Sequence, residues 1–264
     1  MVLGYTGDRV YDTILYTALA IAVVAMIASK FIAAPYGRFG ERMSLPKLHP
    51  RWGWMLMELP ATLVFWPSFL TGPNAHATAP MFIAAVWGAH YLNRGFVFPW
   101  LIRAPRSSRS FSVLVIGSGI VVTSLHGWLH GYFVSRYATH LLGDWLADPR
   151  FLVGVGLYLS GMALNIHSDA ILRNLRTREE VERGERVYRV PMGGGFRFVT
   201  NPQYFGELVA WIGFAMVTWS LAGVFILSIS LANLVPRAIE THAWYRERFP
   251  DYPRDRRALV PFLF

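Results

Sequence analysis

Residues 111–133 read FSVLVIGSGIVVTSLHGWLHGYF, and residues 151–167 read FLVGVGLYLSGMALNIH. Neither stretch contains Asp, Glu, Lys or Arg. A helix that crosses a bilayer core needs about 20 mostly apolar residues of this kind. The whole chain agrees, because 54% of its 264 residues are hydrophobic and only 16% are charged. An average soluble domain has about a quarter charged residues. The sequence therefore predicts an all-α integral membrane protein.

Five further segments have nearly the same length and composition as these two. The segment that contains Glu58, Pro60 and Pro67 is the weakest of them, because it carries a charge and two helix-disturbing residues. No internal repeat or long linker divides the chain, so residues 1–264 are predicted to form a single membrane domain. The seven predicted transmembrane helices cover residues 11–34, 54–72, 80–102, 111–135, 150–172, 203–220 and 222–243.

The basic residues predict the orientation of these helices, since cytoplasmic loops are rich in Lys and Arg. If the N-terminus lies outside and the chain crosses seven times, 21 of the 25 Lys and Arg residues fall on the inner side. The C-terminus then lies in the cytoplasm, at a bacterial inner membrane or the endoplasmic reticulum. Loop 174–200 and tail 247–264 are predicted to form a cap over the cytoplasmic mouth.

Composition also excludes several classes of function. The net charge is +9 and the pI is about 10.1, but the basic residues are spread between apolar runs, so no nucleic-acid partner is predicted. No protein partner is indicated. The chain has no cysteine, which excludes thiolate chemistry, and no G-x-G-x-x-G Rossmann motif. The only lysines, Lys30 and Lys47, lie far from the last span, which excludes a retinal Schiff base. His126 and His130 are predicted to be interfacial histidines, and no metal site is predicted.

Ionisable groups inside a membrane span are costly and indicate function. Glu58 lies in the second span, four residues after Trp54 and on the same helical face. Tyr91 and Arg94 lie in the third span. Glu58 has two possible roles that do not exclude each other: it donates a hydrogen bond to a ligand, or it pairs with Arg94.

Two polar stripes mark the cytoplasmic ends of the fifth and seventh predicted helices, where side chains three or four residues apart share a face. Guanidinium groups match phosphate oxygens, so the stripes predict a cleft for a large polar ligand that carries phosphates. The alternative is that these acids and arginines only pair with one another. The stripes consist of Asn165, Asp169, Arg173 and Arg176, and of Arg237, Thr241 and Tyr245.

Several motifs together resemble the family of steroid 5α-reductases (3-oxo-5α-steroid 4-dehydrogenases): LMELP (56–60), AHYLNR (89–94), NIHSDAILRNLR (165–176), YRVPMGGGF (188–196), NPQYFGE (201–207), LVPRAIETHAWY (234–245) and FPDYPRDRRALVPFLF (249–264). The resemblance covers residue 33 to the end. Its most specific pieces are NIHSD followed by LRxLR and the tail that ends in ALVPFLF. The string NPxYxGE is less specific, because isoprenylcysteine methyltransferases and sterol C14-reductases carry similar strings.

The resemblance implies NADPH-dependent reduction of the C4–C5 double bond of a 3-oxo-Δ4-steroid, with hydride passing to C5. It implies that Glu58 and Tyr91 are catalytic and hold the 3-keto oxygen, and that the substrate-binding candidates are Trp54 and Arg94. The residues implied to contact NADPH are Asn165, Asp169, Arg173, Arg176, Tyr204, Glu207, Arg237, His242 and Tyr245.

Other functions remain open from the sequence. A near variant reduces another lipid enone, a polyprenol or an enoyl thioester, since Glu58 and Tyr91 do not specify which lipid bears the carbonyl. S-adenosylmethionine-dependent methyl transfer is supported only by NPxYxGE and by the spacing of Arg237 and Glu240. A membrane protein without enzymatic activity is the third class.

Overall fold

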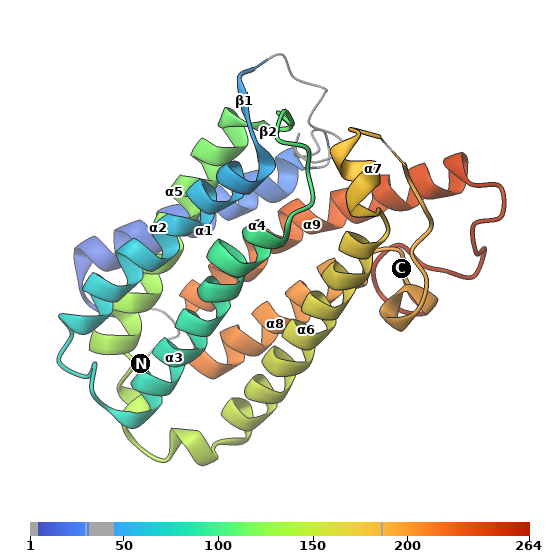
Figure 1. Cartoon of the computed structure of the whole chain (residues 1–264). Helices are drawn as coiled ribbons and strands as arrows, with labels where there is room; N and C mark the ends of the chain where they lie inside the picture. The colour runs from blue at the N-terminus through green and yellow to red at the C-terminus, as the bar shows by residue number, and fades with distance from the viewer. Residues whose placement is uncertain (1–4, 30, 32–44, 186) are drawn as a thin grey trace.

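The computed structural model describes residues 5–29, 31, 45–185 and 187–264, in which long helices run side by side as one bundle (Figure 1). Each of the seven predicted ranges overlaps a helix or a run of consecutive helical segments. The end of the first range, residues 32–34, lies outside the described residues. The α-helices are α1 (Arg9–Ala28), α2 (Pro50–Leu70), α3 (Thr78–Tyr91), α4 (Phe98–Leu101), α5 (Val113–Arg136), α6 (Pro149–Asn174), α7 (Arg178–Glu182), α8 (Pro202–Thr218) and α9 (Leu221–Arg248).

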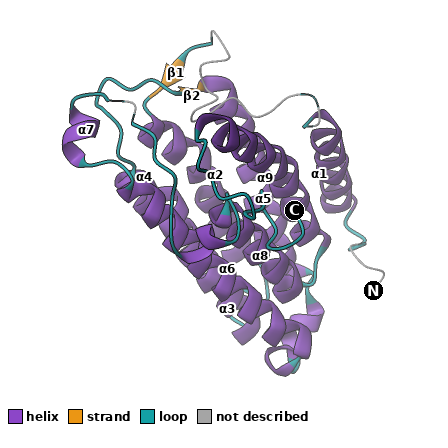
Figure 2. Cartoon of the chain, turned by 90° about the vertical axis from the view of Figure 1, so that its right-hand side faces the viewer, coloured by secondary structure: helices purple, strands orange, loops and turns teal. Residues whose placement is uncertain are grey.

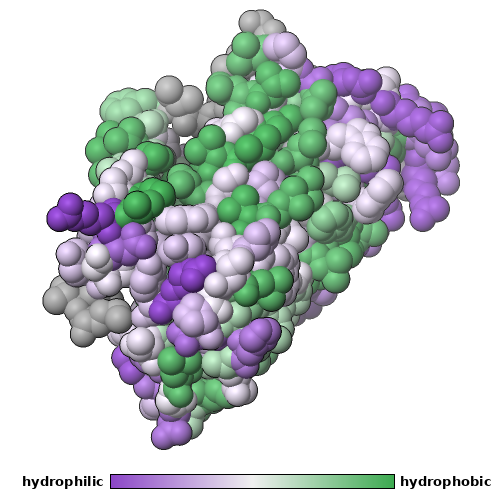
Figure 3. Space-filling model, turned by 90° about the vertical axis from the view of Figure 1, so that its left-hand side faces the viewer, coloured by the Kyte–Doolittle hydropathy of each residue, from purple (hydrophilic) through white to green (hydrophobic). Residues whose placement is uncertain are grey.

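Four of these helices, α1, α5, α6 and α9, are long and apolar enough to cross a membrane. Their outward side chains are apolar: Val24, Leu152 and Leu159, for example, are each more than half exposed. Figure 3 shows hydrophobic residues over much of one face, while hydrophilic residues gather toward its rim and upper right corner. The prediction of a mostly helical membrane protein is therefore confirmed.

A short two-stranded sheet is the exception to the all-α prediction. Strand β1 (Lys47–Leu48) pairs antiparallel with β2 (Phe111–Ser112), with Lys47 opposite Ser112. The two strands directly precede α2 and α5, which pack against each other along their length. The sheet thus joins the starts of two helices whose sequence positions are about 60 residues apart.

Helices α6 and α8 pack closely against each other, because glycines remove side chains from their contact. A Cβ atom on Gly161 would lie 2.5 Å from the backbone nitrogen of Ala210, and one on Gly206 would lie 2.6 Å from the Gly161 carbonyl oxygen. Small residues of this kind let membrane helices approach backbone to backbone. This contact, called the α6–α8 seam below, fixes the relative positions of the polar residues at the ends of both helices.

The third predicted span is not one α-helix. Helix α3 ends at Tyr91, a π-helical segment covers Leu92–Val97, and α4 continues from Phe98. A π-helical turn inside a helix is uncommon and is found frequently at functional sites. Here the π segment carries Arg94, whose side chain points into the bundle and is buried.

The segment before α8 and the chain after α9 are joined at one end of the bundle. The backbone N–H of Thr200 donates to the carbonyl of Arg257 (2.8 Å), and Arg257 donates to the carbonyl of Phe198 (2.9 Å). Buried Arg256 donates from Nη1 to the carbonyl oxygen of Pro191 (3.2 Å). In the view of Figure 2, α7 and the loops lie toward one end of the helices, and α1 lies at the edge of the bundle.

The prediction that His126 and His130 are interfacial is wrong. Both side chains are fully buried, and their rings pack against Trp87, with ring centroids 4.4 and 5.5 Å away. Their i, i+4 spacing puts both on one face of α5, and that face is turned to the other helices and not to the membrane surface.

Candidate active site

Arg94 is the centre of the buried charge cluster. Its Nη2 atom lies 3.1 Å from Oε2 of Glu207 on α8, and its Nη1 atom lies 3.6 Å from Oδ2 of Asp169 on α6. The guanidinium also lies over the rings of Trp54 and Phe98, 4.9 Å from each centroid. Four separate elements therefore meet at one cation, which is only 7% exposed.

Glu58 and Tyr91 lie next to this cluster. A Cβ atom on Gly95, in the π segment, would lie 3.6 Å from the Cβ of Glu58, so α2 passes close to the turn that bears Arg94. Arg94 and Glu207 are the charged neighbours of Glu58, and Glu58 is in turn a charged neighbour of buried Tyr91. The four residues thus form one electrostatic group.

Asn165 extends the cluster along the α6–α8 seam. Its Nδ2 atom donates to the carbonyl oxygen of Gln203 (2.9 Å) and to Oε2 of Glu207 (3.4 Å). Four buried side-chain oxygen atoms have no hydrogen-bond partner among the described residues, and three of them lie along this seam: Asn165 Oδ1, Ser168 Oγ and Gln203 Oε1. Buried polar atoms are normally satisfied, so this seam has unused hydrogen-bonding capacity that a polar ligand can fill.

The two arginines at the end of the first stripe lie beside the loop between α4 and α5. Arg176 Nη2 donates to the carbonyl oxygen of Arg103 (3.2 Å). In return, Arg103 Nη1 donates to the carbonyls of Arg173 (3.3 Å) and Arg176 (3.0 Å). These bonds satisfy carbonyl groups at the C-terminal end of α6, and they concentrate three guanidinium groups there.

The second stripe lies between α8, α9 and the tail. Arg237 is buried, and its Nε and Nη2 atoms each lie 3.4 Å from the Tyr204 hydroxyl. His242 Nδ1 lies 2.6 Å from Thr200 Oγ1, and Tyr245 stacks on Tyr252 with centroids 5.5 Å apart. Tyr204 and Glu207 are one turn apart on α8, so this helix connects the second stripe to the Arg94 cluster.

Sequence reasoning missed Thr200 and Tyr252. The Thr200 hydroxyl lies 2.7 Å from the Tyr252 hydroxyl as well as next to His242, so it links the loop, α9 and the tail. No spacing in the sequence relates these positions, which lie in three segments that meet only in the folded chain.

A model of the 3-oxo-5-alpha-steroid 4-dehydrogenase family matches residues 109–264 of this chain. The chain belongs to this family. Relatives of the 3-oxo-5-alpha-steroid 4-dehydrogenase family extend the match to nearly the full length. The chain is 38% identical over 256 residues to 3-oxo-5-alpha-steroid 4-dehydrogenase 1 of Mus musculus, with 96% of each chain covered. It is 31% identical over 261 residues to steroid 5-alpha-reductase DET2 of Solanum lycopersicum, covering 98% of this chain and 99% of the relative.

The family match confirms the resemblance drawn from the motifs and makes the chain an oxidoreductase of the 3-oxo-5-alpha-steroid 4-dehydrogenase type. Glu58, Tyr91 and Arg94 precede the residues that the family model matches, but the full-length relatives cover most of this part of the chain as well.

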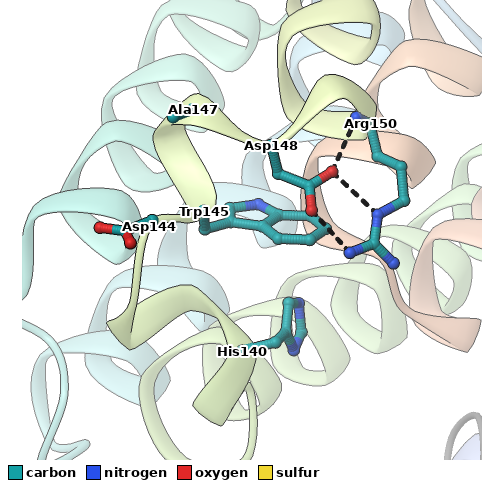
Figure 4. A pocket seen from close by; sticks show the side chains of 6 residues that line it. All are labelled: His140, Asp144, Trp145, Ala147, Asp148 and Arg150. Carbon is teal, nitrogen blue, oxygen red and sulfur yellow. Dashed lines mark hydrogen bonds and ion pairs between the residues drawn. The ribbon is translucent and has the colours of Figure 1, made fainter.

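A separate open surface pocket of about 420 Å³ lies at the other end of α6 (Figure 4). Arg150 donates to both carboxylate oxygens of Asp148, at 2.9 and 2.7 Å, and its guanidinium lies over the Trp145 ring. The hydrogen bond from Arg150 lowers the pKa of Asp148 to about 2. None of the predicted site residues lines this pocket, which is lined by His140, Asp144, Trp145, Ala147, Asp148 and Arg150.

Proposed function

We propose that this protein reduces the C4–C5 double bond of 3-oxo-Δ4-steroids with NADPH, in a site between Glu58, Tyr91 and Arg94. The observation that carries the proposal is the meeting of these residues with Asp169 and Glu207 in one buried cluster, in a chain of the steroid 4-dehydrogenase family. Trp54, which packs on the Arg94 guanidinium, lines the substrate side of this cluster.

The chemistry requires stabilisation of negative charge on the 3-keto oxygen. Attack at C5 of the conjugated enone forms an enolate, and donors already aimed at its oxygen stabilise the transition state. The Tyr91 hydroxyl donates one hydrogen bond, and a protonated Glu58 donates a second. Arg94 balances the charges of Asp169 and Glu207 and so keeps the α6 and α8 carboxylates beside the site.

The residues along α6, α8 and α9 fit a dinucleotide cofactor. NADPH supplies the hydride when it is bound. Unused oxygen atoms of Asn165, Ser168 and Gln203 offer hydrogen bonds along the seam, and guanidinium groups suit phosphates, including a 2′-phosphate. The set proposed to hold the cofactor is Asn165, Asp169, Arg173, Arg176, Tyr204, Glu207, Arg237, His242 and Tyr245.

The proposal includes a topology with seven membrane crossings, the N-terminus outside and the cofactor mouth in the cytoplasm. A steroid is apolar and reaches the bundle through the bilayer, whereas a charged cofactor arrives from water. The joined loop and tail, with the Thr200–Arg257 pairing, form the cytoplasmic cap in this arrangement. The membrane is a bacterial inner membrane or the endoplasmic reticulum.

The decisive experiment measures NADPH oxidation by the purified protein with testosterone or progesterone, and identifies the product by mass. We expect a gain of two hydrogen atoms. Glu58→Gln and Tyr91→Phe each remove one donor, which commonly costs about 2.7–4 kcal/mol, or about 10²–10³ in kcat. We therefore expect both variants to bind NADPH but to reduce the steroid slowly.

Matched controls are Glu182→Gln and Tyr16→Phe, whose side chains are exposed and lie outside the cluster. Both should keep wild-type turnover. Reduction of the steroid at an unchanged rate by Glu58→Gln and Tyr91→Phe would contradict the assigned roles, and a protein that binds no NADPH would contradict the proposed function itself.

A further inference from the structure

Residues 259–264 fold back on themselves and leave large apolar side chains at the surface. The backbone N–H of Leu259 donates to the backbone oxygen of Phe264 (2.7 Å), and the N–H of Phe264 donates to the carbonyl oxygen of Val260 (3.0 Å). The side chains of Phe262 and Leu263 are nevertheless 76% and 81% exposed. This segment is therefore held by hydrogen bonds of its backbone, while its outer side chains have no protein surface to pack on.

The backbone at Phe262 is strained. Its φ angle is 66°, in the left-handed region that bulky residues rarely adopt. The strained residue lies next to a second exposed ring, that of Phe198 before α8, with centroids 5.7 Å apart. Strain of this kind is found mostly at ligand sites and switches, so the pair of rings indicates a surface that binds something.

A pocket of about 290 Å³ lies between these rings, and Arg197, Asp255 and Arg257 complete its lining. All three charged residues are exposed, and their side chains make no ion pair or hydrogen bond with another described residue. Two guanidinium groups and one carboxylate give the pocket a net positive charge. It thus combines an aromatic wall with cations that are available to a ligand.

The pocket lies at the edge of the surface that faces lipid. On α9, which is apolar enough to cross a membrane, Leu231 and Ile239 are exposed, and Val235 lies between them on the same side. Val235 packs against the small apolar cluster that includes Leu259, and Val260 packs there as well. Residues 259–264 therefore continue the outward side of α9, at the end of the bundle that the proposed topology places in the cytoplasm.

We propose that this pocket binds an anionic phospholipid of the cytoplasmic leaflet, with the lipid phosphate between Arg197 and Arg257 and an acyl chain against Phe262. Guanidinium forks match phosphate oxygens, and the negative surface of this leaflet attracts basic residues. The acyl chain covers the exposed ring. Asp255 repels a negative headgroup, and so limits the affinity. None of these residues belongs to the set proposed to hold NADPH, and the inference does not depend on which reaction the protein catalyses.

The test titrates the full-length protein in detergent with phosphatidylglycerol and counts bound lipids by native mass spectrometry, with phosphatidylcholine of the same chain length for comparison. We expect phosphatidylglycerol to bind more tightly. Arg197→Gln and Arg257→Gln should each weaken its binding by about fivefold, and the double variant by about 25-fold, the usual contribution of a basic residue at an anionic surface. Arg178→Gln, at an exposed position on α7, is the matched control and should bind like the wild type.

Two further variants separate binding from stability. Phe262→Gly removes the ring and suits the left-handed backbone, so we expect an unchanged or higher melting temperature without lipid, and weaker binding of phosphatidylglycerol. Asp255→Asn removes the repulsion and should tighten binding. Weaker binding by Asp255→Asn would instead indicate a headgroup with an ammonium group, which contradicts the proposal.

Saturating NADPH distinguishes a lipid phosphate from a phosphate of the cofactor. We expect it to leave the bound phosphatidylglycerol in place. Release of the lipid by NADPH would assign the two guanidinium groups to the cofactor, and equal binding by the double variant and Arg178→Gln would show that the pocket holds no lipid. Either result would overturn the inference and leave the proposed steroid reduction untouched, because no turnover enters the measurement.

Discussion

Arg94 shows how a single side chain can determine the site. Its planar guanidinium reaches Asp169 and Glu207 on two different helices while its face lies on Trp54. A lysine has the same charge but neither the fork nor the flat face. The identity of this residue, and not only its charge, therefore holds α6 and α8 in relation to the π segment.

For this reason we expect Arg94→Lys to fold and to lose activity. Loss of one charge-assisted hydrogen bond costs about 1.5–3 kcal/mol, which corresponds to roughly 10- to 100-fold in kcat/KM for the steroid. The measurement is steady-state reduction with NADPH binding in parallel. Arg9→Lys, at an exposed position, is the control, and equal kcat/KM for the two variants would show that the fork at position 94 is not needed.

At the scale of one element, Glu180 caps the start of the short helix α7 and also binds Arg189. The Thr177 backbone N–H donates to Glu180 Oε2 (2.8 Å), and the Thr177 hydroxyl accepts from the Glu180 N–H (3.2 Å), which is a capping box. Arg189 donates to both carboxylate oxygens of Glu180 and to the carbonyl of Leu175. One carboxylate thus connects the end of α6, the start of α7 and the loop that leads to α8.

The hydrogen bonds from Arg189 lower the pKa of Glu180 from 4.5 to about 2. A lowered pKa means that the contact stabilises α7 above pH 4.5 and is lost as the pH falls toward 2. We expect slow amide hydrogen exchange in Arg178–Glu182 to persist at pH 4, after correction for intrinsic rates. Glu180→Gln should remove this protection and exposed Glu182→Gln should not. Loss of protection near pH 4.5 in the wild type would contradict the assignment.

For the whole molecule, the absence of cysteine makes the orientation in the membrane directly measurable. Ala147, at the pocket of Figure 4, and Glu182, on α7, are both exposed and lie at opposite ends of α6. The proposed topology puts Ala147 outside and Glu182 in the cytoplasm.

We therefore expect a membrane-impermeant maleimide to label Ala147→Cys in intact cells. Glu182→Cys should react only after the membrane is opened. The unmodified protein, which has no thiol, is the blank. Labelling of Glu182→Cys alone in intact cells would invert the topology, and labelling of both would contradict a helix α6 that spans the membrane.

Much of the fold could be predicted because lipid imposes a simple requirement on sequence. Apolar runs of sufficient length coincide with the helices, even where Pro60 and Pro67 weaken the pattern of α2. The polar stripes also coincide with helix faces: Asn165 and Asp169 both lie on the α6 side that meets α8 and Arg94. The hydropathy pattern does not specify which helices pack against each other. The burial of His126 and the contacts of Thr200 with α9 and the tail could therefore not be predicted.

The sequence pattern did not predict the π segment either. This segment has a consequence for how the site can be altered. A π turn holds about one residue more than an α turn, so Leu92–Val97 is equivalent to a helix with a single inserted residue. Each residue of an α-helix advances the side-chain direction by about 100°. Deleting one residue from this segment would leave every chemical group of the cluster in the chain and would turn Tyr91 away from Arg94's partners. The number of residues in the π segment is thus as important for the geometry of the site as the side chains themselves.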